Sequence, residues 1–355
     1  MSNGIDECEA IIFDIDGVLV DVRRSYNEAI IKTVQLILKD SYDIKISNEF
    51  PFEKLISKLR NTGGFNNDID TAYAIILIIL HCILINKMNI EKTLVTFDKV
   101  VEKLDDKGKD SVEKELESMG DIRTIINELS YPGHAAAKND DDGNDENVIS
   151  TLFNEIFYGP VLFKKRFDRE PRYYFEKPLI SNDILIIKDE TIKKLSQRFN
   201  GNLGLISGRS KVASYFTLGN FMKYFKDNAC IFLEDEKREF SKPNAYSLHR
   251  VLDNLGLKSA LYVGDSIADL LMVENFNGQV NKKSKVFFCG VYGEGVDRNI
   301  SSESEHDDNN TTTATHEACE NNLSKIKEEI LRSKNADLII ENVNDLPNIL
   351  NITKN

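Results

Sequence analysis

The residues best suited to chemistry are four aspartates at the ends of two short apolar runs. Asp14 and Asp16 come directly after Ala-Ile-Ile-Phe at residues 10–13. Side chains two residues apart in an extended chain project to the same face, so both carboxylates face one site. Asp265 and Asp269 are spaced i, i+4 at a predicted strand-to-helix junction, which lets both reach one divalent cation beside Asp14. The pattern predicts a magnesium site made of carboxylates.

These residue types match the needs of phosphoryl transfer. A negatively charged nucleophile must approach a negatively charged phosphate, so the reaction requires a cation, a positioned nucleophile and a proton source. Asp14 would attack phosphorus and form an aspartyl phosphate. Asp16 would protonate the leaving oxygen and then deprotonate the hydrolytic water. Ser207 and the backbone N–H groups around Gly208 can bind phosphoryl oxygens, while Lys242 supplies a positive charge.

The elements that must position these side chains have the pattern of a parallel α/β sheet. Continuous apolar runs that end in polar or glycine-containing turns are typical of buried parallel strands. Ligands of such sheets bind at the carboxyl ends of the strands. Helical periodicity between the runs predicts the crossover helices that parallel strands require. Strands are expected at residues 10–13, 203–206, 260–263, 286–289 and 336–340, and helices at residues 191–199, 213–216, 244–255 and 267–275.

A large insertion separates the first two strands that carry site residues. The stretch between them is far longer than one crossover and shows mostly helical periodicity. We therefore expect a catalytic core of residues 1–21 and 183–355 with an inserted α-helical cap domain of residues 22–182. Residues 138–147 and 297–322 are polar and are expected to be mobile loops.

Composition narrows the class of protein. The chain has 355 residues, 41% of them hydrophobic, and a net charge of −13, which is typical of a soluble globular protein. The acidic balance and the lack of a dense Lys/Arg run argue against binding to nucleic acid or an anionic membrane. The five cysteines lack metal-binding spacing, and MSNGIDECEA lacks the features of a secretory signal. We expect reduced thiols and a cytoplasmic enzyme.

Residues 72–85 are almost continuously apolar. They are fewer than the roughly 20 residues that a membrane-spanning helix needs. We therefore expect a buried helix rather than a membrane segment. His81, which lies within it, is expected to be a hydrogen-bonded core residue.

Four segments together resemble a known family. FDIDGVLVD, ISGRS, SKPNAYSL and VGDSIAD are similar, in this order, to motifs one to four of the haloacid dehalogenase superfamily. The resemblance covers roughly residues 9–21 and 183–350. An insertion directly after motif one is similar to that of subfamily I, the branch with a helical C1-type cap that includes phosphoglycolate phosphatases and β-phosphoglucomutases. At roughly 160 residues, the insertion is about twice the usual size for such caps.

The resemblance implies a Rossmann-like core and a role for each matching residue. It implies that Asp14 is the nucleophile and Asp16 the acid/base, and that Ser207 and Lys242 bind phosphate. An aspartate at position 16 favours phosphoryl transfer, because the dehalogenase and phosphonate-cleaving branches replace that acid. The implied magnesium ligands are Asp14, the backbone carbonyl of Asp16, Asp265 and Asp269.

Further substrate contacts are expected from residues outside the four catalytic roles. Arg209 is either a substrate contact or part of a surface salt bridge. Arg23 and Arg24 follow the nucleophile loop closely enough to reach the substrate, although a hinge and helix start would explain the segment equally well.

Residues 63–68 (GGFNND) are a candidate specificity loop in the insertion. Asn66 and Asn67 offer polar groups beside flexible glycines. The alternative is a turn in which Asp68 or Asp70 caps the following helix.

The function expected from these residues is hydrolysis of a small phosphorylated metabolite by a magnesium-dependent phosphatase. The first alternative is a phosphomutase similar to β-phosphoglucomutase, which would use Asp14 and Asp16 but protect the aspartyl phosphate from water. The second is a non-catalytic binding module, against which the four aspartates argue. No residue selects one substrate or indicates the oligomeric state.

Overall fold

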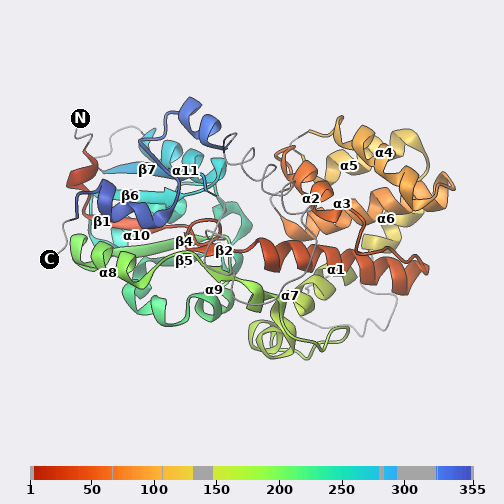
Figure 1. The fold of residues 1–355 in the computed structure, drawn as a ribbon, viewed down its shortest axis with the longest axis horizontal. Helices are drawn as coiled ribbons and strands as arrows, with labels where there is room; N and C mark the ends of the chain where they lie inside the picture. The colour runs from red at the N-terminus through yellow and green to blue at the C-terminus, as the bar shows by residue number, and fades with distance from the viewer. Residues whose placement is uncertain are drawn as a thin grey trace, which may run out of the picture. The chain divides into compact units, whose positions relative to one another are not determined.

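The chain folds into two compact units. The computed structural model describes residues 4–65, 67–105, 107–130, 147–279, 284–293, 325 and 327–352. Met1–Val22 and Asp183–Asn355 form one unit, here called the sheet unit, and Arg23–Asn182 form the helical unit (Figure 1). The predicted mobile loops 138–147 and 297–322 lie outside the described residues, except Asn147, whose side chain caps a helix.

The sheet unit contains a six-stranded parallel sheet, which confirms the predicted α/β fold. Its strand order is β5-β4-β1-β6-β7-β8, and each neighbouring pair is parallel. β1 lies between β4 and β6, so the residues that follow these three strands emerge side by side at one edge of the sheet. The strands are β1 (Ala10–Phe13), β4 (Leu203–Ser207), β5 (Cys230–Phe232), β6 (Ser259–Gly264), β7 (Lys285–Val291) and β8 (Leu338–Ile340).

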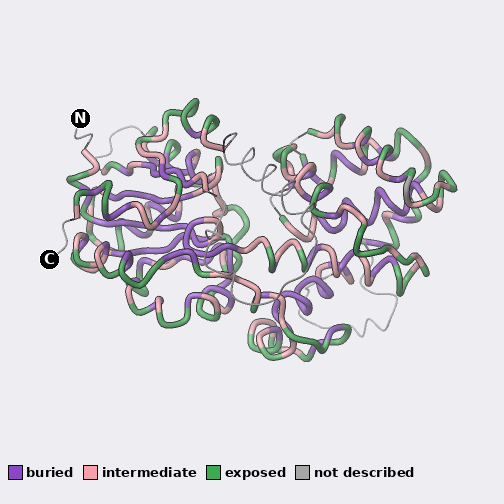
Figure 2. Tube along the Cα trace, in the orientation of Figure 1, coloured by how far each residue is buried: buried purple, intermediate pink, exposed green. Residues whose placement is uncertain are grey.

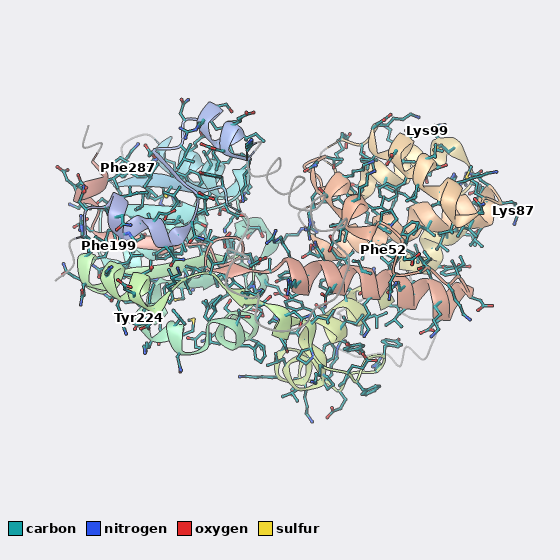
Figure 3. All side chains as sticks on the ribbon, viewed as in Figure 1. Phe52, Lys87, Lys99, Phe199, Tyr224 and Phe287 are labelled. Atoms are coloured by element: carbon teal, nitrogen blue, oxygen red, sulfur yellow. The ribbon has the colours of Figure 1, made fainter. Side chains whose placement is uncertain are left out.

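Helices cover both faces of this sheet. Alternate residues of a strand point to opposite faces, so Ile11 packs in one hydrophobic layer and Ile12 in the other. Phe199, which follows α8, belongs to the first layer (Figure 3). Burial on both faces explains why the strands are continuous apolar runs, and the strands form the buried centre of the unit (Figure 2). The helices are α8 (Asp189–Arg198), α9 (Lys211–Leu218), α10 (Tyr246–Leu255), α11 (Ile267–Asn277) and α13 (Leu346–Ile349), and residues 327–333 are helical as well.

A two-stranded antiparallel sheet lies where the chain leaves the sheet unit for the helical unit and where it returns. β2 (Val20–Asp21) pairs with β3 (Ile184–Leu185). β2 precedes the first residue of the helical unit, and β3 follows its last. The two strands that flank residues 23–182 in the sequence are thus paired with each other.

The helical unit is built around α3. Every residue from Thr71 to Leu80 is buried, because α3 contacts α1, α2, α4, α5, α6 and α7. A helix that is apolar on all sides is typical of such a central position. The unit contains α1 (Arg23–Tyr42), α2 (Phe52–Arg60), α3 (Asp68–Leu80), α4 (Ile90–Val101), α5 (Lys109–Met119), α6 (Arg123–Ser130) and α7 (Val148–Phe167).

α3 continues into a single π-helical turn, His81–Ile85. Asp68–Ile85 is long and apolar enough to cross a membrane by length and composition, with a mean hydropathy of 2.0, yet 67% of it is buried inside the unit. His81 is fully buried, and its Nε2 lies 2.9 Å from Asn86 Nδ2. The segment therefore packs as the buried helix that was predicted, with His81 hydrogen-bonded in its core.

Candidate active site

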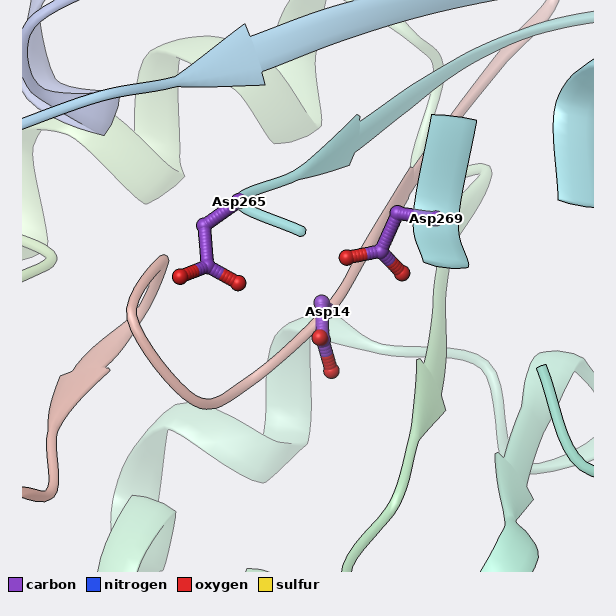
Figure 4. Close-up of side chains that lie close together, drawn as sticks. All are labelled: Asp14, Asp265 and Asp269. Carbon is purple, nitrogen blue, oxygen red and sulfur yellow. The ribbon is translucent and has the colours of Figure 1, made fainter. Parts of the chain in front are cut away.

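Three carboxylates meet where β1 and β6 end (Figure 4). Asp14 follows β1, Asp265 follows β6, and Asp269 lies in the first turn of α11. One oxygen of each lies within 4.8 Å of the others; Asp14 and Asp269 are buried and Asp265 is half-buried. Hard oxygen ligands at this separation fit a divalent cation such as Mg²⁺.

Local hydrogen bonds fix the orientation of Asp269. The Ser266 hydroxyl accepts from the Asp269 backbone N–H at 3.2 Å and the Ser266 backbone N–H donates to Asp269 Oδ2 at 3.1 Å, which forms a capping box at the start of α11. The Ser266 hydroxyl also donates to Asp269 Oδ2, at 2.6 Å. The Tyr262 hydroxyl donates to Asp269 Oδ1 at 2.8 Å. Gly264 leaves room for this carboxylate, since a Cβ there would lie 2.6 Å from Asp269 Cγ. These contacts fix the orientation of the Asp269 carboxylate.

Lys242 bridges two of the carboxylates. Its Nζ lies 2.8 Å from Asp14 Oδ2 and 2.7 Å from Asp269 Oδ1. Burial raises the pKa of Asp14 to about 8, although Lys242 opposes this shift. Burial acts on Asp269 in the same direction, but Lys242 and the hydrogen bonds from Ser266 and Tyr262 outweigh it and lower the pKa. Lys242 brings a single positive charge to the two carboxylates of Asp14 and Asp269, and a divalent cation would favour ionised Asp14.

Asp16 is held by a buried arginine. Arg209 Nε lies 2.5 Å from Asp16 Oδ1, and Arg209 Nη2 lies 2.8 Å from Asp183 Oδ2. Nη1 donates to Thr217 Oγ1 at 2.9 Å. The Arg209 side chain is fully buried, so Arg209 does form a salt bridge but not at the surface: its guanidinium lies in the interior, and one of its partners is the predicted acid/base residue. A direct contact between Arg209 and substrate stays a prediction.

The surroundings of Asp16 suit proton transfer near neutral pH. Burial raises the pKa of Asp16 to about 6, and Arg209 opposes that shift. The Asp16 side chain is 31% exposed, so it is accessible to a ligand. An acid/base group works best when its pKa is close to the operating pH.

Ser207 and Gly208 follow β4, next to the strand that carries Asp14. β1 and β4 pair with Phe13 opposite Leu205, which brings Ser207 to the same edge as Asp14. Ser207 is buried and its Oγ accepts the Arg209 backbone N–H at 3.3 Å. Gly208 is exposed and no atom lies within 4 Å of where its Cβ would be. The turn thus leaves open space where a phosphoryl group was predicted to bind.

The backbone of Gly17 lies very close to the carboxylate of Asp265. Gly17 has φ of +70°, and a Cβ there would lie 2.3 Å from Asp265 Oδ2. Only glycine provides both the left-handed conformation and the space. On its other side, Asp265 Oδ2 is 2.8 Å from Lys327 Nζ.

Four residues of this arrangement were not identified by the sequence analysis. Ser266 lies within VGDSIAD and Tyr262 directly precedes it, so the motif could have identified both hydroxyls as partners of the site. Asp183 and Lys327 have no motif around them, and only the folded chain brings them to Arg209 and Asp265.

The predicted substrate contacts of the insertion belong to the helical unit. Arg23 and Arg24 open α1, and their substrate role stays a prediction. Asn66 lies outside the described residues. Asn67 Oδ1 accepts backbone N–H groups of Ile69 at 2.8 Å and of the next residue at 3.2 Å. The cap of α3 is therefore Asn67, and the expectation that Asp68 or Asp70 caps this helix is wrong.

Comparisons with known proteins agree on the fold. The family model described as haloacid dehalogenase-like hydrolase matches residues 8–277. An X-ray structure of a Northeast Structural Genomics Consortium target is 17% identical, with a TM-score of 0.62, covering 96% of this chain and 98% of that chain. Phosphatase Tt82 from Thermococcus thioreducens is 22% identical, with a TM-score of 0.50, covering 79% of this chain and 92% of that chain. No curated protein matches the chain.

Proposed function

Because the chain belongs to the haloacid dehalogenase-like hydrolase family, we propose that it is a magnesium-dependent phosphatase that hydrolyses a small phosphorylated metabolite through an aspartyl phosphate. The observation that carries this proposal is the Asp14 carboxylate, which is buried beside Asp265, Asp269 and Lys242 at the end of β1. A carboxylate in these surroundings has the nucleophile, the cation ligands and the positive charge that phosphoryl transfer requires. The Thermococcus thioreducens protein is named a phosphatase, which is the same class of reaction.

Asp14 forms and releases the covalent intermediate in this mechanism. One Asp14 oxygen bonds to phosphorus while the bond from phosphorus to the leaving oxygen breaks. Asp16 gives its proton to that leaving oxygen, then takes a proton from water as the water oxygen attacks phosphorus and frees Asp14. Lys242 orients Asp14 through the 2.8 Å contact to Oδ2.

The cation and the β4 turn supply the remaining stabilisation. Magnesium held by Asp14, Asp265 and Asp269, with the Asp16 carbonyl as a further ligand, would neutralise charge on the phosphoryl group. Ser207 and the exposed backbone at Gly208 donate hydrogen bonds to phosphoryl oxygens as charge spreads over them.

The test is phosphate release from a panel of phosphorylated metabolites, with and without Mg²⁺. We expect metal-dependent turnover of at least one compound in the native chain and a loss of about a thousandfold or more in Asp14→Asn. Asp253→Asn is the control, because Asp253 is exposed on α10. Mass spectrometry of the rapidly quenched native enzyme should find a phosphoryl group on the peptide that contains Asp14.

Two results would contradict the proposal. The first is turnover by Asp14→Asn at the native rate. The second is a folded native chain that releases phosphate from no member of a panel that spans sugar, amino-acid and carboxylic-acid phosphates.

A further inference from the structure

A second lysine, Lys327, contacts the cluster formed by Asp14, Asp265 and Asp269. It lies outside the four sequence motifs. Lys327 Nζ lies 2.8 Å from Asp265 Oδ2, and the two side chains are 28% and 24% exposed. Lys242 makes its contacts to Asp14 and Asp269 instead. Each of the three predicted metal-binding aspartates therefore has a lysine ammonium against one of its oxygens.

Lys327 is directed to Asp265 by the packing of its helix. Residues 327–333 are helical, and Leu331 of this helix is buried in the layer that covers one face of the sheet. Gly290 of β7 permits this close packing, since a Cβ there would lie 2.9 Å from Leu331 Cδ1. Lys327 precedes Leu331 by four residues and so lies on the same helix face, which faces the sheet.

The helix is also anchored at its carboxyl end. Asn335 has φ of +57°, the left-handed conformation that ends many helices, and the Ala336 N–H donates to the Leu331 carbonyl at 3.2 Å. β8 then begins at Leu338 and pairs with β7. The position of Lys327 is thus set by sheet packing and not by its ion pair alone.

Lys327 and a divalent cation need the same carboxylate. The Gly17 backbone lies close to Asp265 Oδ2 on one side, and the Lys327 ammonium contacts the same oxygen on the other. A cation bound by Asp14, Asp265 and Asp269 would either displace the ammonium from Oδ2 or lie within a few ångströms of it. Both arrangements oppose metal binding, the first by competition and the second by repulsion.

We propose that Lys327 is a positioning residue that holds Asp265 in the metal-free protein and weakens the affinity of the site for divalent cations. The inference rests on the metal site of the proposed function. Lys327 thereby sets the Mg²⁺ concentration at which the site fills, and a magnesium supply well above that concentration is needed for full occupancy.

The test measures Mg²⁺ binding by isothermal titration calorimetry, without substrate. Lys327→Gln removes one unit charge beside a divalent cation, and at a water-like dielectric this predicts roughly tenfold tighter binding. Lys327→Arg keeps the charge and should bind Mg²⁺ with about the native affinity. Lys325→Gln is the matched control, because Lys325 is exposed and lies two residues away, on a different helix face.

A thermal unfolding series gives a second readout. Without metal, Lys327→Gln should unfold at a lower temperature than the native chain because Asp265 has lost its partner. Added Mg²⁺ should raise its unfolding temperature by more than it raises the native one, since tighter binding stabilises the folded state further. A lysine with a purely structural role would lower the first temperature and leave the response to Mg²⁺ at the native size.

Asp265→Asn separates the two proposals. If Asp265→Asn has lost Mg²⁺ binding while Lys327→Gln binds as weakly as the native chain or more weakly, the role of Lys327 is refuted and the metal site stands. If the native chain and Asp265→Asn bind Mg²⁺ equally, the metal site itself is wrong and the inference falls with it.

Discussion

Replacing Arg209 by methionine is expected to destabilise the sheet unit strongly. The guanidinium is fully buried and contacts Asp16, Asp183 and Thr217. Methionine reproduces the unbranched arginine stem only as far as Nε and has no charge or hydrogen-bond donor, so both carboxylates lose their ionic partner at once.

The magnitude follows from how exposed each carboxylate is. The Asp183 side chain is 2% exposed, and leaving one member of a buried ion pair behind costs about 3–5 kcal/mol. Thr217 still donates to Asp183 Oδ2 at 2.7 Å, which favours the lower end of that range. The Asp16 side chain is 31% exposed and can turn to water, so it adds little. We expect a loss of about 3 kcal/mol, which a domain of ordinary stability survives.

Urea unfolding at pH 7.5, compared between variants, measures this loss. Arg250→Met is the control, because Arg250 pairs with Glu236 at the surface, with side chains 41% and 26% exposed, and should lose less than about 1 kcal/mol. Asp183→Asn should lose about 1–2 kcal/mol, since its amide oxygen can still accept hydrogen bonds. The reasoning is refuted if Arg209→Met loses no more stability than Arg250→Met does.

Three other substitutions test separate features. Gly17→Ala should weaken Mg²⁺ binding in calorimetry, because its Cβ would lie 2.3 Å from Asp265 Oδ2. Gly201→Ala is the control, because Gly201 has a similar φ of +71° with open space around it. Equal Mg²⁺ affinity in the two variants would contradict this account. Asn67→Ala should lose about 1 kcal/mol in thermal or urea unfolding through loss of the α3 cap; an unchanged KM would limit Asn67 to this role, whereas a raised KM would support the specificity-loop hypothesis. Burial lowers the pKa of His81 below its usual 6.5, so the unfolded chain takes up the proton first and stability falls as pH drops below about 6.5. His81→Gln should show a shallower fall in urea unfolding between pH 7.5 and 5, and an identical slope would rule His81 out as its cause.

The parallel strands could be predicted from sequence because of how they are buried. Ala10–Phe13 and Leu203–Ser207 are covered on both faces, so they are continuous apolar runs with carboxylate or hydroxyl side chains where they end. β2 and β3 have two residues each, too few for any periodicity to show. β5 has three residues and was missed for the same reason.

The partners of the site residues were harder to predict than the residues themselves. A motif identifies Asp16 and Arg209, but their ion pair depends on the turns after β1 and β4 meeting at one edge of the sheet. Asp183 joins them only because the chain returns there from the helical unit. Lys327 lies in a sequence of mixed charge, where nothing distinguishes it from its neighbour Lys325 until Leu331 fixes which side of the helix faces the sheet.

The ladder between β2 and β3 has a consequence for protein engineering. Asp21 pairs with Ile184, so Val22 and Asp183 are the two positions that would join the strands if residues 23–182 were excised. Antiparallel strands can be connected by a two-residue hairpin, for which Asn-Gly is a favoured turn. Residues 23–182 thus leave and re-enter the sheet unit at adjacent positions of one strand pair, which makes this junction the place where an insertion from another protein with closely spaced ends would be exchanged for them.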